Sequence, residues 1–235
     1  MGLENNKFEG TFSIITSDGL IRVKVPEGTP KAKLCEYELS DGSKGSKWEL
    51  EFTEVSGRIT AIKFLEAQFG KVMNVNIVDK GEVIALSLQV ASNFCEDLMK
   101  KLPGIDFSKV VTLKPYSFED KKTGKPKKGV TVTQDGEKIP NFFVEVGEDG
   151  RGKAVNGFPE VEDKKYDKDD WKIYFMQVRK FLMNYAEVNV FPKLVPFAEQ
   201  VGGQVVEDVE IDDVDVVIDD IKVDGDIKPE AIPFD

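Results

Sequence analysis

Histidine is absent from this 235-residue chain. Histidine is the side chain that most often acts as a general base in enzymes, and it completes Ser-His and Cys-His pairs and many zinc sites. The two cysteines, Cys35 and Cys95, lack the spacing of a metal site or a redox pair, and Cys95 lies in an apolar helical pattern typical of a core residue. From these absences we expect a protein that is not an enzyme and that needs no metal ion or other cofactor.

Long apolar runs are absent as well. No stretch reaches the roughly 18 apolar residues that a membrane-spanning helix requires. The first residues, MGLENNKFEGTF, lack the basic start and apolar core of a signal peptide, and Asn6 stands where a myristoylation motif needs Ser or Thr. We therefore expect a cytoplasmic protein without a membrane partner.

Arginine is scarce, and the chain contains only Arg22, Arg58, Arg151 and Arg179. Proteins that read base edges in the grooves of duplex DNA depend strongly on arginine. Lysines and aromatic rings instead contact the phosphate backbone and stack on bases without regard to sequence. If this chain binds nucleic acid, its composition favours unspecific contacts of that second kind.

Negative charge is abundant, and it is concentrated at one end of the chain. The whole chain has a net charge of −11, and residues 207–235 alone contribute −10 through twelve carboxylates and two lysines, Lys222 and Lys228. Residues 1–206 therefore carry a net charge of only about −1. A block of like charge with few aromatic residues buries too little apolar surface to offset its chain entropy, so we expect residues 207–235 to form a disordered acidic tail.

Near its end the acidic tail has three consecutive residues with apolar side chains, Ile232, Pro233 and Phe234, which are followed by Asp235. Charge alone leaves open whether such a tail binds a partner or only keeps the protein in solution. A large apolar side chain is costly to leave in water. The tip therefore favours a tail that binds a partner protein through Ile232, Pro233 and Phe234.

Residues 1–206 are predicted to form one mainly β domain. The pattern predicts strands at residues 8–15, 20–25, 34–39, 48–52, 55–67, 72–78, 82–90, 110–118, 129–134 and 138–144. One helix is predicted from Ser92 to the Pro103-Gly104 pair, and another from Trp171 to about Val188, capped by Asp169-Asp170. Residues 147–157 are predicted to be a mobile loop, and residues 191–206 a last strand or edge segment.

The order of the predicted elements favours one architecture. Three strands, a helix and two further strands follow one another between about residues 55 and 145. That order is the one found in the OB-fold, a small Greek-key barrel that binds oligonucleotides. We therefore predict an OB-fold barrel core with extra N-terminal strands, a C-terminal helix and the acidic tail, although other β-rich folds share this order.

The basic residues are also concentrated in one stretch. Eight lysines and four carboxylates lie between Lys109 and Lys138. Alternate residues on the predicted strand before the basic loop share one face, and they are Lys114, Tyr116 and Phe118. The lysines of the loop itself are Lys121, Lys122, Lys125, Lys127 and Lys128. Lysines that neutralise phosphates beside rings that stack on bases would make a surface for single-stranded DNA. A solvated lysine loop above core aromatics is the alternative.

A second set of candidates lies outside this stretch. Phe69 and Lys71 stand at the turn between two predicted strands, where barrels of this kind often grip a nucleic-acid strand, and Lys63 and Phe64 precede them. Trp48 shares a strand face with Leu50 and Phe52, which is typical of core packing, but a stacking role at a wet surface is the alternative.

Two segments resemble a known family. They are SGRITAIKFLEAQFGKVMNVNI and KLPGIDFSKVVTLKPYSFEDKKTGKPKKGVTVTQDGEKIPNFF, and the likeness runs from Ser56 to Phe143, with a weaker match around Asp169-Asp170-Trp171. They resemble the single-stranded DNA-binding proteins encoded by many tailed bacteriophages. The acidic tail is similar to the tip of bacterial single-strand-binding proteins, which recruits replication partners, but that tip normally ends on the phenylalanine, whereas Asp235 follows Phe234 here.

The resemblance implies a protein that coats and protects single-stranded DNA during phage replication or recombination in the cytoplasm of the host cell. Its partners would be single-stranded DNA and, through the tail, replication or recombination proteins. Two other classes of protein are the alternatives. One is a metal-dependent nuclease, but residues 1–206 show no set of acidic residues spaced to hold its metal ions. The other is an interaction or inhibitor module that does not bind DNA and whose acidic tail mimics nucleic acid.

Overall fold

The computed structural model describes residues 10–38, 42–68, 70–121, 124–147, 152–161 and 165–194. Phe69, Lys122, the acidic tail and most of the segment 191–206 lie outside these ranges, together with the expectations made for them. Within the described ranges, no helix is long and apolar enough to cross a membrane.

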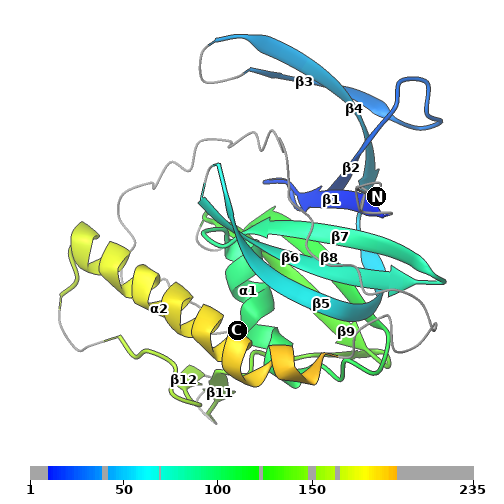
Figure 1. The fold of residues 1–235 in the computed structure, drawn as a ribbon. Coiled ribbons are helices and arrows are strands. Elements are labelled where there is room, and N and C mark those ends of the chain that lie inside the picture. Colours follow the sequence, from blue (N-terminus) through cyan, green and yellow to red (C-terminus); the bar gives the residue numbers. More distant parts are fainter. Residues whose placement is uncertain are drawn as a thin grey trace, which may run out of the picture.

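The described chain is mainly β, as the pattern predicts, and most of its strands join one ten-stranded sheet (Figure 1). The strands of this sheet are β1 (Thr11–Ile15), β2 (Ile21–Val25), β3 (Lys33–Glu38), β4 (Lys44–Phe52), β5 (Val55–Ala67), β6 (Gly70–Asp79), β7 (Glu82–Gln89), β8 (Val111–Glu119), β9 (Pro126–Gln134) and β10 (Glu137–Lys138). Their order across the sheet is β10-β9-β8-β5-β6-β7-β1-β2-β4-β3. The helices are α1 (Asn93–Lys101) and α2 (Lys168–Asn189), with short 3-10 turns η1 (Leu102–Gly104) and η2 (Phe191–Lys193).

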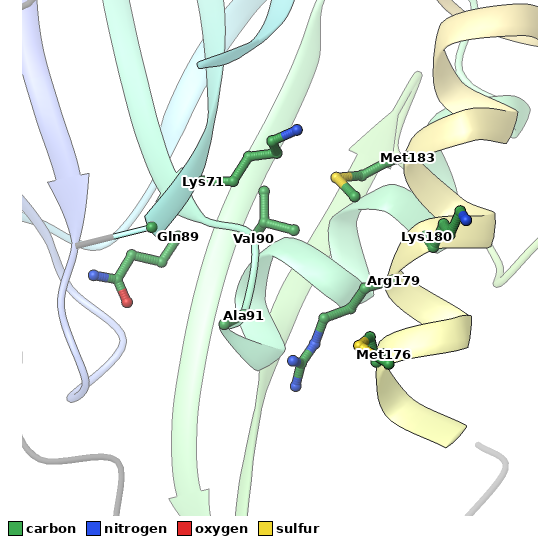
Figure 2. A pocket seen from close by; sticks show the side chains of 9 residues that line it. Lys71, Gln89, Val90, Ala91, Met176, Arg179, Lys180 and Met183 are labelled. Atoms are coloured by element: carbon green, nitrogen blue, oxygen red, sulfur yellow. The ribbon is translucent and has the colours of Figure 1, made fainter. Parts of the chain in front are cut away.

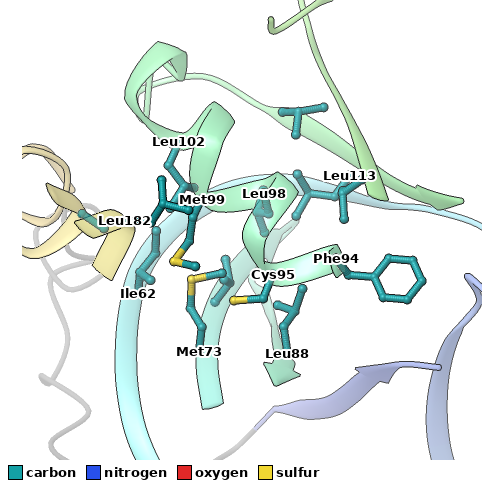
Figure 3. Close-up of a cluster of buried hydrophobic side chains, with 14 of the residues drawn as sticks. Ile62, Met73, Leu88, Phe94, Cys95, Leu98, Met99, Leu102, Leu113 and Leu182 are labelled. Atoms are coloured by element: carbon teal, nitrogen blue, oxygen red, sulfur yellow. The ribbon is translucent and has the colours of Figure 1, made fainter. Parts of the chain in front are cut away.

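The core lies where α1 packs against the strands β5 to β9, and the buried face of α2 adds to it. Ser92 caps α1, because its hydroxyl oxygen accepts a hydrogen bond from the backbone nitrogen of Cys95 at 3.2 Å. Figure 3 shows Leu98 and Met99 of α1 among side chains of the strands, including Ile62 and Met73. Full burial of each large apolar side chain contributes roughly 1.5–3 kcal/mol. The predicted helix and its core face, with Cys95 fully buried, are confirmed.

The predicted barrel is not closed in this structure. The pairings β5–β6, β6–β7, β5–β8 and β8–β9 are all present, but the sheet does not close between β7 and β9. At the outer edge of β9, side chains of α1 take the place of a strand. The backbone nitrogen of Val130 donates to Asp97 Oδ2, and Lys101 Nζ donates to the Val130 carbonyl, both at 2.7 Å. The backbone nitrogen and carbonyl of Val130 are thereby satisfied without barrel closure.

The N-terminal strands extend the sheet on its other side. β1 runs parallel to β7 and occupies the edge of β7 that a closed barrel would use. The turn after β1 packs against β8, since a Cβ atom at Gly19 would lie 2.7 Å from the backbone nitrogen of Ser117. β3 and β4 form a ribbon that projects away from the rest of the sheet (Figure 1).

The long helix α2 packs beside α1. Its buried stripe consists of Trp171, Tyr174, Val178, Leu182 and Ala186, at the three- and four-residue spacing expected for a core-facing helix. The predicted cap is wrong by a few residues. Asp167 is the N-cap and forms a capping box with Asp170, so the helix begins at Lys168.

Two other expectations are corrected between β9 and α2. Of the predicted strand 138–144, only the two end residues are in strands, Lys138 in β10 and Val144 in β11. The residues between them are not, because Pro140 cannot donate a ladder hydrogen bond and Phe143 turns inward against Phe181 and Tyr185. The predicted loop at 147–157 is flanked and partly occupied by a small antiparallel pair, β11 (Val144–Val146) and β12 (Gly152–Ala154).

Candidate nucleic-acid interface

The outer face of β8 carries the first-choice candidates. Leu113 and Pro115 point into the core, while Lys114 and Phe118 are exposed and Tyr116 is half-buried. The rings of Tyr116 and Phe118 lie with centroids 5.6 Å apart, and Phe118 is 53 % exposed. The predicted alternation is therefore confirmed, and the strand presents two neighbouring rings to solvent with a lysine beside them.

A glycine on the neighbouring strand positions Tyr116. Gly129 of β9 is paired with Tyr116, and a Cβ atom there would lie 2.4 Å from the tyrosine hydroxyl oxygen and 2.4 Å from Asp97 Oδ2. Only the absence of a side chain at Gly129 lets the ring lie across β9 at this point. Sequence reasoning missed this residue, because the pairing of Tyr116 with Gly129 depends on the register of two strands.

Lysines lie on both strands of the hairpin and at the turn between them. The pattern predicts that Lys127 and Lys128 lie in the loop. In the structure both belong to β9, where Lys127 is paired with Phe118 and Lys128 with Ser117. Lys121 and Lys125 are exposed at the turn between the strands. We call the outer face of β8 and β9 with these side chains the hairpin surface. Its members are Lys114, Tyr116, Phe118, Lys121, Lys125 and Lys127. Lys128 is paired with Ser117, which alternates with Tyr116 and Phe118, so Lys128 lies on the opposite face of the hairpin.

Two lysines of the hairpin surface form ion pairs that differ in exposure. Lys114 Nζ lies 3.9 Å from Glu54 Oε2, and both side chains are largely exposed. Lys127 Nζ lies 3.3 Å from Asp120 Oδ2. The Lys127–Asp120 pair is the more shielded of the two. Exposed ion pairs contribute roughly 0–1 kcal/mol, so a phosphate can replace Glu54 beside Lys114 at little cost. Lys109, at the base of the hairpin, is held more closely, since its 2.7 Å hydrogen bond to Asp135 raises the pKa of Lys109.

The structure does not bring the second-choice residues to the hairpin surface. The start of β5 pairs with β8, whereas Lys63 and Phe64 lie toward the far end of β5, and Lys71 follows the turn into β6. The 13 residues of β5 correspond to a contour of about 40 Å. Phe64 also packs against Phe191, with ring centroids 5.5 Å apart, which gives it a structural role.

Trp48 lies on the projecting ribbon. It is paired with Val25 on one side and Leu34 on the other, and it is half-buried rather than part of the main core. Neither the hairpin surface nor the Lys71 region includes it. The structure thus separates the candidates into three places.

Sequence reasoning missed a groove beside Lys71. It lies between the start of β6 and α2, and Figure 2 shows Lys71 and Met183 on opposite sides of it, with Arg179 reaching toward Ala91. The side chains of α2 that line it are Met176, Arg179, Lys180 and Met183. Their helical spacing is visible in the sequence, but their position next to Lys71 is not.

The described residues offer no group of three or more Cys, Asp or Glu side chains placed to hold a metal ion. Burial strongly raises the pKa of the Cys95 thiol. Burial, and then a hydrogen bond and charge interaction with Glu49, also raise the pKa of Cys35. Both thiols are therefore protonated and weakly nucleophilic at neutral pH.

Comparisons of the chain with protein-family models, with curated proteins and with solved structures found no match.

Proposed function

We propose that this protein binds single-stranded DNA without sequence preference and coats and protects it in phage DNA replication or recombination. The observation that carries the proposal is the pair of half-buried Tyr116 and exposed Phe118, whose rings lie 5.6 Å apart on one strand face beside lysines. Rings of this kind stack on any base, and lysines release counterions when they neutralise phosphates. The scarcity of arginine agrees with binding that does not read sequence.

The connectivity supports an OB-type domain as the scaffold. β5, β6 and β7 form a meander, α1 follows, and β8 and β9 form a hairpin whose first strand pairs with β5. OB-folds are partly open barrels that bind oligonucleotides with the loops between strands 1 and 2 and between strands 4 and 5. In this chain those loops are the β5–β6 turn beside Lys71 and the β8–β9 turn of the hairpin surface.

The resemblance of residues 56–143 to phage single-stranded DNA-binding proteins supports the same proposal. Under it, the acidic tail recruits replication or recombination proteins through Ile232, Pro233 and Phe234. The net charge of −10 in residues 207–235 also favours a second candidate, an interaction module whose tail mimics nucleic acid and which does not bind DNA itself.

Fluorescence anisotropy of a labelled single-stranded oligonucleotide, beside a duplex of equal length, tests the proposal over a salt series. We expect tighter binding of the single strand, affinity that falls as salt rises, and a loss of about 5- to 150-fold for Tyr116→Ala, since one stacked base contributes roughly 1–3 kcal/mol. Failure to bind either DNA at low salt, both by the full chain and by a chain without residues 207–235, would reject the proposal and favour the interaction module.

A further inference from the structure

The groove beside Lys71 is extended along the surface. Two adjoining hollows of about 400 and 540 Å³ share Lys71, Lys180 and Met183 in their linings. One runs from Gly70 and Ala91 to Met176, and the other continues along α2 to Glu187. We call the two together the α2 groove. Its elongated form suits a chain-like ligand.

The charges of the α2 groove favour an anion. Lys71, Arg179 and Lys180 line it, against one carboxylate of the lining, Glu187. Lys71 also lies 3.1 Å from Glu66, but that carboxylate is 77 % exposed and the pair is weak. Within the part of the chain that the structure describes, neither Arg179 nor Lys180 forms an ion pair or a hydrogen bond.

Arg179 adds a second observation. Its Nε atom is shielded from solvent and has no hydrogen-bond acceptor. A buried donor without an acceptor costs free energy, and most such groups in folded proteins have a partner. The guanidinium of Arg179 has a fork of donors that fits phosphate oxygens. A phosphate in the groove would therefore lie beside a cation that lacks an acceptor.

The apolar part of the lining suits a base. Met176 is 62 % exposed, and Met183 faces Lys71 across the groove (Figure 2). Methionine sulfur makes favourable contacts with aromatic rings and adapts to different shapes. A nucleotide chain offers both phosphates for the cations and flat rings for the methionines, whereas a carboxylate-rich peptide offers mainly the charge.

We infer that the α2 groove is a second contact site for the same single strand of DNA that the hairpin surface binds. This inference rests on the proposed function. Phosphates contact Arg179, Lys180 and Lys71, and bases or sugars pack on Met176 and Met183. Because the two surfaces lie at opposite ends of β5, only a strand long enough to span them engages both.

The test compares two lengths of oligothymidylate with full-length protein. One has about 5 nucleotides, near the lower limit of site sizes for one OB-fold, and the other about 25, well above the upper limit. The double variant Arg179→Ala/Lys180→Ala is measured beside Lys168→Ala/Lys172→Ala, which removes the same charge from α2 outside the groove. Lys180→Glu serves as a second groove variant, since Lys180 is exposed and its change does not disturb the core.

We expect both groove variants to weaken binding of the long oligonucleotide, the double variant by about tenfold, and to leave the short one unchanged. The slope of log affinity against log salt for the long oligonucleotide should fall by about 1.4 for the double variant, at about 0.7 per phosphate contact. The Lys168/Lys172 control should keep the wild-type slope.

Three outcomes would overturn the inference. If the groove variants bind the long oligonucleotide as the control does, while Tyr116→Ala weakens it, the groove does not contact DNA and the proposed function stands. If the groove variants bind DNA more tightly, the groove holds the acidic tail instead. If the wild-type chain binds neither oligonucleotide, the proposed function itself fails.

Discussion

The β3–β4 ribbon and the β8–β9 hairpin share one structural device and differ in charge. In each, a tyrosine ring lies over a glycine of the partner strand: Tyr37 over Gly45 in the ribbon and Tyr116 over Gly129 in the hairpin. In the ribbon, Lys47 of the protein itself lies over the Tyr37 ring, 5.6 Å from its centroid. In the hairpin, the neighbour of the half-buried Tyr116 ring is an exposed ring, that of Phe118.

The surrounding charges separate the two regions further. β3 and β4 together carry three lysines and four glutamates. β8 and β9 carry three lysines, Lys114, Lys127 and Lys128, and one glutamate, Glu119. In the ribbon, the tyrosine ring therefore has a packing role, because a lysine of the protein itself lies over the ring and the strands carry more carboxylates than lysines. In the hairpin, the same placement of a ring provides a candidate base-stacking surface, because a second ring lies beside the tyrosine and lysines outnumber carboxylates on the two strands.

The largest expected effect comes from removing both hairpin rings. Tyr116→Ala/Phe118→Ala should weaken single-stranded DNA binding by about 30-fold or more, because each stacked base contributes roughly 1–3 kcal/mol. Fluorescence anisotropy measures the loss. Tyr37→Ala is the matched control on the ribbon and should keep wild-type affinity. Equal losses in the two variants would remove the distinction between the regions.

The two glycines sharpen the comparison. Gly129→Ala and Gly45→Ala each place a Cβ atom about 2.4–2.5 Å from a tyrosine ring or hydroxyl, so each should lower the free energy of unfolding by roughly 1–3 kcal/mol in urea titrations. Only Gly129→Ala should also weaken DNA binding, since it displaces Tyr116. If Gly129→Ala binds DNA normally, the position of the Tyr116 ring does not matter for binding.

The acidic tail should distinguish the regions by charge. Because the tail is tethered to the same chain, its effective concentration is on the order of millimolar. We therefore expect it to compete with DNA for lysines of the hairpin surface. Deleting residues 207–235 should tighten DNA binding several-fold, most clearly at low salt, where screening is weakest. Anisotropy titrations of the full and shortened chains at two salt concentrations measure this. An unchanged affinity at both would show that the tail does not occupy the surface.

Single lysines give the smallest effect. Lys127→Ala should reduce the slope of log affinity against log salt by about 0.7, the value of one phosphate contact with a single strand. Lys47→Ala on the ribbon should leave the slope unchanged, because Lys47 lies 2.9 Å from Glu49 and covers Tyr37. A slope that falls in both variants would place DNA on the ribbon as well, beside Trp48.

Much of the fold follows from local pattern. The alternation of Val111, Leu113 and Pro115 with Lys114, Tyr116 and Phe118 places the rings on the outer face, and the spacing of Phe94, Cys95, Leu98 and Met99 defines the core face of α1. These features depend on residues a few positions apart, where backbone geometry fixes which side chains share a face. The candidate rings and lysines of the hairpin were predictable for the same reason.

What only the tertiary structure decided depends on residues far apart in the sequence. Asp97 and Lys101 of α1 satisfy the edge of β9, and β1 takes the edge of β7, so the expected barrel does not close. Local periodicity carries no information about which edges meet. The α2 groove likewise forms because packing of the buried stripe of α2 places Arg179 and Lys180 beside Lys71, more than a hundred residues earlier in the chain. The sequence by itself determined which side chains are available on each element, and the packing of the elements determined which of them lie together.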